Sequence, residues 1–431
     1  MRRFRACVVF CLLGVSLSAQ GLSITLDDAL ERGLEQSLSL KQSQIDLDLA
    51  AGSAENLWAQ VFPGISVSGG IDYRNSLSGT RPQNPLSYTA AADISLELTN
   101  SLVFSMRNIS LAYQTQLLSY DQARRALELN ITKTFFSLLA RQSRLAILEE
   151  DSRLAEAQNE KQETAFRNGL VSELVTLRSR LAAEEARFAL SQARAQFNAD
   201  LGKFLALLAY EQTPDARLEG ELAVRELHPD GEALIRDYLR KRPDIIMQRQ
   251  RIANLENAKS LSAVSSRGPV VSLGARWNGG YGDTWNNFPG DFSDAISGSL
   301  SIRIPLDPWL PGSRGDQNIR SASGDLEKAR LELEDMERNG MAEIRSYAAT
   351  INNLWESIEI ARLRSEIAVR TYELSEEGYR SGTVEFLDLQ NTRQDMVNAR
   401  QQLLDAELSY QNLVLDLAAL INVEWTQLQN P

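Results

Sequence analysis

Few side chains in this sequence have the type and spacing that covalent catalysis or metal binding requires. The single histidine, His228, precedes Pro229 in a polar stretch, where a lone histidine is usually solvated rather than a ligand. Both cysteines, Cys7 and Cys11, lie in an N-terminal segment typical of a cleaved leader, so no disulfide or thiolate metal site is expected. Gly-x-Ser-x-Gly elbows, phosphate-binding loops and metal-ligand spacings do not occur. We therefore expect no enzyme, no metal and no cofactor.

The many carboxylates follow a surface pattern rather than that of a catalytic acid–base pair. The sequence holds 57 Asp and Glu against 45 Lys and Arg, which gives a formal net charge of −12. The acidic residues are spread along helical stretches, three or four positions from Lys or Arg, as on the exposed face of a helix. This acidic balance, with no basic patch interleaved with aromatic residues, argues against a nucleic-acid partner.

Residues 1–20 have the pattern of a secretory signal peptide. Arginines at positions 2, 3 and 5 precede an apolar run at 6–17 that is too short to span a bilayer, and mostly small residues follow it. Neither cysteine stands at the end of the apolar run, where a lipid-acceptor cysteine would lie. A lipoprotein is therefore not expected, although variant signal sequences leave this open. No other apolar run approaches 18 residues, so no transmembrane helix is predicted.

The elements that must position any functional residue occur twice. The segment 166–171 (FRNGLV) recurs as 379–384 (YRSGTV), and further residues agree at the same offset of 213. In each half a proline, Pro63 or Pro269, leads from an amphipathic stretch directly into an alternating strand. Agreement at so many positions in one register indicates a tandem duplication. The predicted units are a first repeat, a linker and a second repeat, at residues 21–213, 214–231 and 232–431.

Each repeat opens with a helix and continues into a pair of strands. Apolar and polar side chains alternate within residues 65–99 and again within 270–306, where Ile304 and Leu306 are expected to continue the apolar face. Runs of ten or more residues are long for soluble strands but suit strands that cross a membrane at a tilt. Loops rich in Gly, Pro and Asn separate the strands of each pair, at residues 75–85 and 282–294.

Each repeat then holds a helical hairpin of unusual length, predicted at residues 105–210 and 323–420. Soluble helices average about 11 or 12 residues, whereas these would be several times longer. Apolar positions in both hairpins step by 3 and 4, the spacing of a coiled-coil seam. Glycines are expected to end the long helices, because a tight reversal needs a positive φ somewhere. These turn glycines are Gly169 in the first repeat and Gly378 and Gly382 in the second.

Four membrane-type strands cannot close on themselves. An open sheet edge in lipid leaves backbone groups unpaired at several kcal/mol each, so only a closed barrel is stable there. The smallest single-chain barrels have eight strands, so this chain must oligomerise. The helices are too long to fold back over a barrel about 25 Å tall and must project along its axis. The sequence thus predicts a mixed α/β membrane protein in which a β-barrel continues into an α-helical tube.

Two other classes of protein remain as alternatives. A soluble coiled-coil protein with an attached β-sandwich, the layout of a periplasmic adaptor, explains the hairpins. It explains less well why each half contributes the same strand pair followed by the same hairpin. A nutrient porin is disfavoured, because it needs no long helices.

With these residues in place, the sequence resembles the TolC-like outer-membrane factor family over nearly the whole mature chain. The resemblance is carried by the opening LDDAL at 26–30, by the two strand-entry prolines, and by YRSGT at 379–383 followed by FLDL at 386–389 and NAR at 398–400. It implies a homotrimer with a twelve-stranded outer-membrane barrel, four strands per chain, surrounded by lipid and continuous with a periplasmic helical barrel. It also implies a passive exit duct for efflux or type I secretion. Such a duct docks to a periplasmic adaptor and an inner-membrane transporter of the RND or ABC type.

The resemblance further implies a constriction at the periplasmic tip, where family members place acidic rings. The tyrosine before the turn glycine is Tyr379 in this sequence. The first acidic position, six residues beyond Gly382, is Asp388. The second, nine residues beyond, is Asn391, a departure that would leave one acidic ring rather than two.

The links that hold this constriction closed in the family are incomplete here. Val384 occupies the position where some members have an arginine, and Val175 that of the first-repeat aspartate. Arg178 corresponds to Asn391 in the first repeat and could pair with Asp388 instead. Alternatively, Asp388 is one more solvated helix charge.

Overall fold

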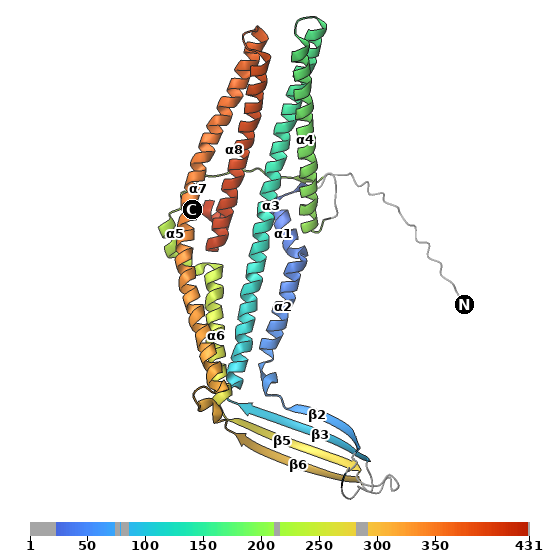
Figure 1. Cartoon of the computed structure of the whole chain (residues 1–431), viewed down its shortest axis with the longest axis vertical. Coiled ribbons are helices and arrows are strands. Elements are labelled where there is room, and N and C mark those ends of the chain that lie inside the picture. Colours follow the sequence, from blue (N-terminus) through green and yellow to red (C-terminus); the bar gives the residue numbers. More distant parts are fainter. Residues whose placement is uncertain (1–22, 74–77, 79–85, 211–215, 282–291, 430–431) are drawn as a thin grey trace, which may run out of the picture.

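The computed structural model describes residues 23–73, 78, 86–210, 216–281 and 292–429. The predicted signal peptide and most of both inter-strand loops lie outside the described residues. In the described part of the chain, a sheet stands at one end of a rod of long helices (Figure 1).

The two predicted strand pairs form one antiparallel four-stranded sheet. Its order is β2-β3-β5-β6, so the two hairpins join through the central pair β3–β5. Pro63 and Pro269 each directly precede the first strand of their pair. The strands span Gly64–Tyr73 (β2), Leu86–Thr99 (β3), Val270–Tyr281 (β5) and Phe292–Arg303 (β6).

The predicted end of the last strand is wrong. Strand β6 ends at Arg303, so Ile304 and Leu306 do not continue its apolar face. The physical reason is Pro305, which has no backbone N–H to donate to a sheet ladder.

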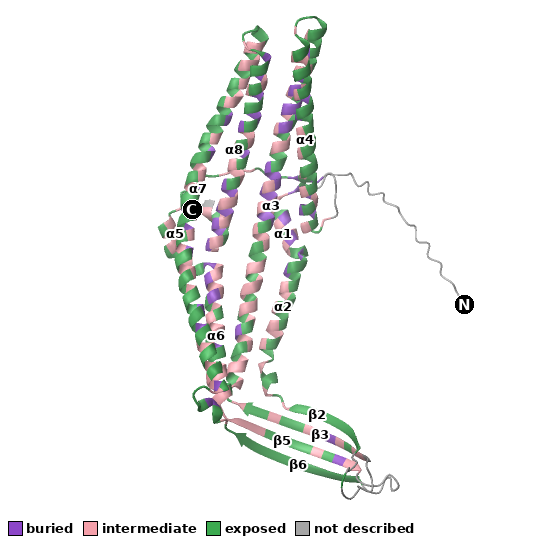
Figure 2. Cartoon of the chain, in the orientation of Figure 1, coloured by how far each residue is buried: buried purple, intermediate pink, exposed green. Residues whose placement is uncertain are grey.

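The register of the sheet keeps apolar and polar rows on opposite faces. Leu96, Leu273 and Leu300 lie opposite one another across three strands. Asp93 and Arg276 are paired on the other face, where Arg276 Nε lies 3.2 Å from Asp93 Oδ1. Every described residue of β6 is exposed in the single chain, apolar ones included (Figure 2). One face therefore needs an apolar environment outside this chain.

The first hairpin consists of α3 (Leu102–Arg167) and α4 (Glu173–Leu207). The 66 residues of α3 span about 100 Å at 1.5 Å per residue. Ile131, Phe135 and Leu138 follow the predicted spacing of 4 and 3 residues. All three are buried, and they pack with Phe204 of α4. Burying each of these side chains contributes roughly 1.5–3 kcal/mol.

The second hairpin consists of α7 (Arg314–Ser381) and α8 (Phe386–Ile421). Helix α7 begins nine residues before the predicted start at 323, because Ser313 caps it by accepting a hydrogen bond from Asp316 N. It also passes through Gly378, which was expected to end it, and ends only at Gly382. Its seam residues Ile344, Ile351 and Ile358 are fully buried against α8 and its neighbours.

Shorter helices lengthen the rod between the returning helices and the sheet. Helices α1 (Leu26–Gln36) and α2 (Leu38–Glu55) lie along α3, and α6 (Pro243–Arg267) lies along α7 (Figure 1). None of the described helices combines the length and apolarity that a membrane-spanning helix needs. The remaining short elements are β1 (Ser23–Ile24), η1 (Leu57–Val61), β4 (Arg217–Leu218), α5 (Gly231–Tyr238), η2 (Leu239–Lys241), η4 (Asp307–Trp309) and α9 (Trp425–Gln429).

Candidate functional site at the hairpin tips

The two hairpin turns lie together at the end of the rod farthest from the sheet (Figure 1). Gly169 and Gly382 both adopt a left-handed backbone, with φ of 73° and 79°. Glycine adopts this conformation without the steric cost that a Cβ adds. Backbone hydrogen bonds close each turn, including Leu170 N to Ala165 O at 2.9 Å and Thr383 N to Gly378 O at 2.8 Å. The predicted turn glycines therefore set the direction in which α4 and α8 leave the tip.

Asp388 and Asn391 lie in the first two turns of α8, directly after the second hairpin turn. Both are exposed, and neither side chain makes a hydrogen bond or ion pair to another described residue of the chain. A carboxylate in the first turn of a helix is stabilised by the helix dipole. Apart from this interaction with its own helix, the Asp388 side chain has no partner among the described residues of one chain.

Tyr379 joins the two hairpins. Its hydroxyl accepts a 2.8 Å hydrogen bond from Nε2 of Gln162, which is almost fully buried on α3. Its ring also packs against Phe386, with 6.0 Å between ring centroids. Gln162 was not predicted as a site residue, and its contact ties the end of α7 to the first hairpin.

The remaining predicted latch residues do not meet within one chain. Val175 is half-buried on α4 and Arg178 is exposed beside it. Among the described residues, no ion pair connects Arg178 to Asp388, so that pairing stays a prediction for the assembled protein. Val384 has a structural place: its Cγ2 lies 2.5 Å from where a Cβ at Gly378 would stand, so this valine covers the last turn of α7.

A second link between the hairpins was missed by the sequence reasoning. Asp151 on α3 and Arg393 on α8 form an ion pair, with only 5% and 9% of their surfaces exposed. Burial raises the pKa of Asp151, and the positive charge and hydrogen bond of Arg393 oppose that shift. Close by, Arg400 Nη1 lies 2.6 Å from Glu150 Oε2. These pairs fix how far α8 lies from α3.

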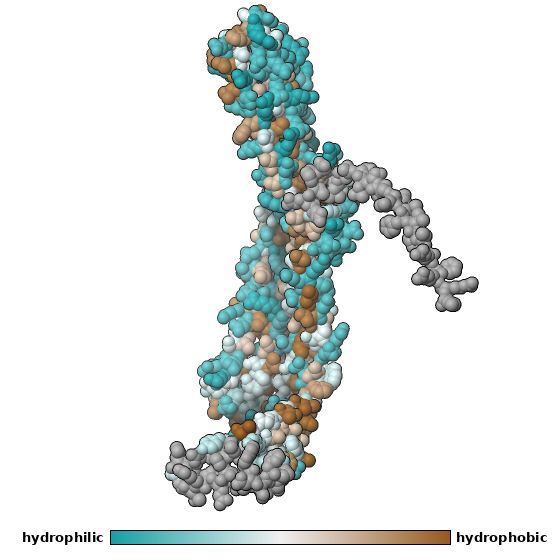
Figure 3. Space-filling view, turned by 90° about the vertical axis from the view of Figure 1, so that its right-hand side faces the viewer, coloured by the Kyte–Doolittle hydropathy of each residue, from teal (hydrophilic) through white to brown (hydrophobic). Residues whose placement is uncertain are grey.

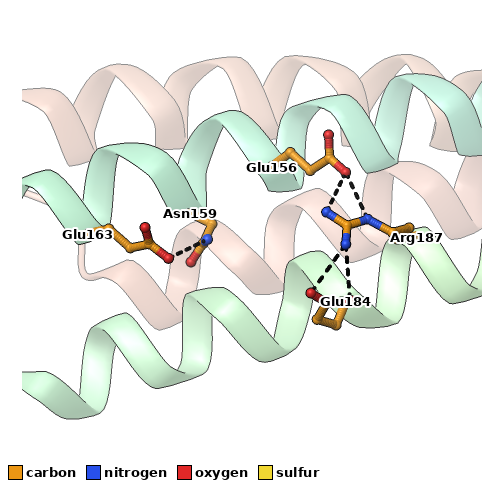
Figure 4. Close-up of polar contacts among 5 residues, drawn as sticks. All are labelled: Glu156, Asn159, Glu163, Glu184 and Arg187. Atoms are coloured by element: carbon orange, nitrogen blue, oxygen red, sulfur yellow. Dashed lines mark hydrogen bonds and ion pairs between the residues drawn. The ribbon is translucent and has the colours of Figure 1, made fainter.

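The polar contacts within the first hairpin differ from the Asp151–Arg393 pair because they lie at the surface. Arg187 of α4 donates to Glu156 Oε1 of α3 at 3.0 Å and to Glu184 at 3.3 Å, while Asn159 donates to Glu163 at 3.0 Å (Figure 4). The ion-pairing side chains are about half exposed, so each pair contributes about 0–1 kcal/mol. His228 is likewise exposed, beside Glu226.

Comparison with known proteins identifies this architecture. A model of the family described as outer membrane efflux protein matches residues 29–208 and again 234–423, once in each repeat. A probable outer membrane lipoprotein, SilC of Salmonella typhimurium, is 24% identical in an alignment 418 residues long that covers 89% of this chain and 84% of SilC.

Solved structures show the same fold. The CmeC outer membrane channel of Campylobacter jejuni has a TM-score of 0.75 at 18% identity, covering 92% of this chain and 85% of CmeC. The MtrE outer membrane channel of Neisseria gonorrhoeae, solved in its open state, has a TM-score of 0.72 at 16% identity, covering 92% of this chain and 89% of MtrE.

An outer-membrane channel is therefore the class of protein that this fold defines. The chain belongs to the outer membrane efflux protein family. It is an outer-membrane exit duct with a periplasmic extension, and none of these comparisons supports the adaptor alternative.

Proposed function

We propose that three copies of this chain form the exit duct of a tripartite export assembly. The observation that carries the proposal is the placement of an open four-stranded sheet and of the hairpin tips at opposite ends of one rod (Figure 1). The sheet would sit in the outer membrane. The tips would reach across the periplasm to an adaptor protein and an inner-membrane transporter of the RND or ABC type.

The unpaired strand edges support oligomerisation. Within the described sheet β2 and β6 each pair on one side only, and lipid cannot satisfy the other side. Two copies would give eight strands, and a barrel of that size is just wide enough for its own side chains to fill. Three copies give twelve strands and leave room for a lumen. Passage through that lumen requires no catalytic step by the protein.

An apolar patch at the junction of helices and sheet supports the placement of the sheet in a membrane. In the face drawn in Figure 3, apolar side chains gather where the helices meet the sheet, whereas hydrophilic ones cover most of the rod of helices. Trp58, Phe62 and Trp309 are all more than half exposed at this junction. Aromatic girdles of this kind mark the membrane interfaces of β-barrels.

The gate of this duct would be a ring of three Asp388 carboxylates at the hairpin tips, with Asn391 supplying a neutral polar ring beside it. The exposed, unpaired state of Asp388 within one chain supports this assignment. A ring of carboxylates attracts cations and repels anions. The Gln162–Tyr379 hydrogen bond would hold the tip of α7 against the first hairpin.

Single-channel recording of the purified protein in a planar bilayer tests the proposed duct and gate. We expect a small, cation-selective conductance that multivalent cations block from the side of the tips. Asp388→Ala should weaken the block and shift selectivity toward anions. Asp395→Ala, two turns farther from the tip on the same side of α8, is the matched control and should do neither.

Arg178→Ala tests the substitute latch separately. If Arg178 restrains Asp388 in the assembly, its loss should raise conductance without changing oligomer stability. Unchanged conductance, selectivity and block in both Asp388→Ala and Arg178→Ala would place the constriction elsewhere. A protein that forms no conducting pore at all would contradict the proposed duct itself.

A further inference from the structure

A cavity of about 400 Å³ lies between α7 and α8, which run side by side in the second hairpin (Figure 1). Its apolar part is lined by Ile367 and Ala368 of α7 and by Ala399 of α8. Two alanines at one stretch of the helix contact leave space that larger side chains would fill. Sites for small molecules occupy roughly 300–1,000 Å³, so the cavity has the size of a small-solute site.

Opposite charges stand at the two ends of this cavity. Arg364 of α7 donates from Nη1 to Oε1 of Gln402 on α8 at 3.1 Å, so these two residues lie at the same level of the hairpin. Seven residues nearer the tip on each helix, Thr371 and Asp395 also line the cavity. Seven residues span about 10 Å of helix. The cavity therefore has a guanidinium at the end nearer the sheet and a carboxylate at the end nearer the tip.

The hydrogen-bonding groups at the two ends are also opposite in kind. The hydroxyls of Thr371 and Thr392 donate to backbone oxygens of their own helices, at 2.8 and 3.0 Å, so toward the cavity they can only accept. Among the described residues, the Asp395 side chain has no hydrogen bond or ion pair. Acceptors alone suit an ammonium group, which has donors only. The guanidinium of Arg364 keeps most of its N–H donors free, which suits a carboxylate.

The cavity opens on the side of α8 that carries Asp388. Asp395 follows Asp388 by seven residues, or about two turns, so both side chains leave the same side of the helix. In the duct proposed above, where Asp388 lines the lumen, the cavity therefore opens into the lumen as well. Asp395 lies about 10 Å from Asp388 along the axis, roughly one Debye length at physiological ionic strength. Screening thus separates Asp395 from the cation block at the tip.

We propose that this cavity binds zwitterionic solutes that pass through the duct. The ammonium group of the solute contacts Asp395, its carboxylate contacts Arg364, and its apolar middle lies against Ala368 and Ala399. The inference rests on the duct proposed above and names a class of solute that its lumen takes. Because both charges stay partly exposed, each contact is weak. The solute is therefore held briefly and released, as conduction requires.

Single-channel recording with ω-aminooctanoic acid tests the site, because its extended chain separates the two charges by a similar distance. Added on the side of the sheet, it should reduce the current at a half-maximal concentration at least fivefold lower than that of γ-aminobutyric acid, which is too short to reach both ends. Arg364→Gln removes the carboxylate partner, and Ala368→Leu fills the cavity without changing a charge. Each should raise the half-maximal concentration of ω-aminooctanoic acid at least fivefold.

Arg370→Gln is the matched control for the loss of an arginine. Arg370 lies six residues farther along α7 on another side of the helix, where it pairs with Glu373 at 2.8 Å. Its replacement should leave the effect of ω-aminooctanoic acid unchanged. Circular dichroism of each variant verifies that the helices remain folded.

Two results would overturn the zwitterion site and leave the duct standing. One is a conducting protein on which the two amino acids act at the same concentration, since the cavity would then not recognise the separation of the charges. The other is a conducting protein in which neither Arg364→Gln nor Ala368→Leu changes the effect of ω-aminooctanoic acid. A protein that forms no conducting pore would contradict the duct and this inference together.

Discussion

At the residue scale, the buried pair of Asp151 and Arg393 connects the two helical hairpins. Two charges taken out of water contribute little net stability as a pair, but removing one partner leaves the other uncompensated. The two residues are 242 positions apart in the sequence. The repeat offset maps Asp151 onto Arg364, so the duplication does not produce a second copy of this ion pair. Only the antiparallel register of α3 and α8 brings them together. For that reason the sequence predicted the helices and missed this contact.

Asp151→Asn is expected to destabilise the folded protein by about 3–5 kcal/mol, because it leaves the Arg393 guanidinium buried without a counter-charge. Thermal unfolding followed by circular dichroism measures the loss. Replacing both residues with apolar ones, Asp151→Leu with Arg393→Met, should recover most of it. Glu156→Gln, which removes an exposed partner of Arg187, should cost less than about 1 kcal/mol. Similar losses at both sites would mean that Asp151 is solvated in the assembled protein.

At the same scale, the resemblance to the outer-membrane factor family indicated where the tip residues lie but not which residues they contact. Asp388, Asn391 and Tyr379 all lie at the end of the second hairpin, where the motif indicated. Tyr379 packs against Phe386 and accepts a hydrogen bond from Gln162. Its partner Gln162 could not be foreseen, because a glutamine in a long amphipathic helix gives no signal until the neighbouring helix is placed.

At the element scale, strands and hairpins follow from local patterns, and their ends follow from single residues. Alternation located β2, β3 and β5, and Gly169 and Gly382 located the two hairpin turns. The errors arose where one residue outweighs a pattern, as Pro305 does at the end of β6. At Gly378 the single residue did not outweigh the pattern, and α7 continues through it. A helix interior tolerates glycine at a modest cost because its backbone hydrogen bonds remain intact.

Gly382→Ala tests what the second turn requires. At φ of 79° an added Cβ costs about 1–2 kcal/mol, so we expect a lower unfolding temperature and a less ordered tip. Gly324→Ala on the same helix is the control, since that glycine is helical and has open space around its Cβ position. It should be neutral or stabilise the protein by up to about 1 kcal/mol. A neutral Gly382→Ala would mean that the assembled turn has a different backbone.

At the scale of the whole molecule, the architecture could be predicted because few arrangements satisfy a duplicated unit with two membrane-type strands. The sheet cannot close within one chain, and helices of about 100 Å cannot fold back over it. What the sequence could not supply was the lateral order of the helices. That order decides which apolar faces are internal and which are left for a neighbouring copy.

The sheet can be tested directly, because consecutive residues on β6 should face lipid and the aqueous lumen in turn. Ile302 lies opposite Val271 on the apolar face, while Ser301 lies opposite Ser272 on the polar face. In a closed barrel, Ile302→Arg would face lipid and should cost about 2–4 kcal/mol near the midplane. Ser301→Arg would face the lumen, where water solvates the guanidinium, and should be tolerated. Heat stability of the oligomer in gel electrophoresis compares the two variants. Equal stability of both would show that β6 is not a membrane strand, because a strand of a closed barrel has one face toward lipid and the other toward the aqueous lumen.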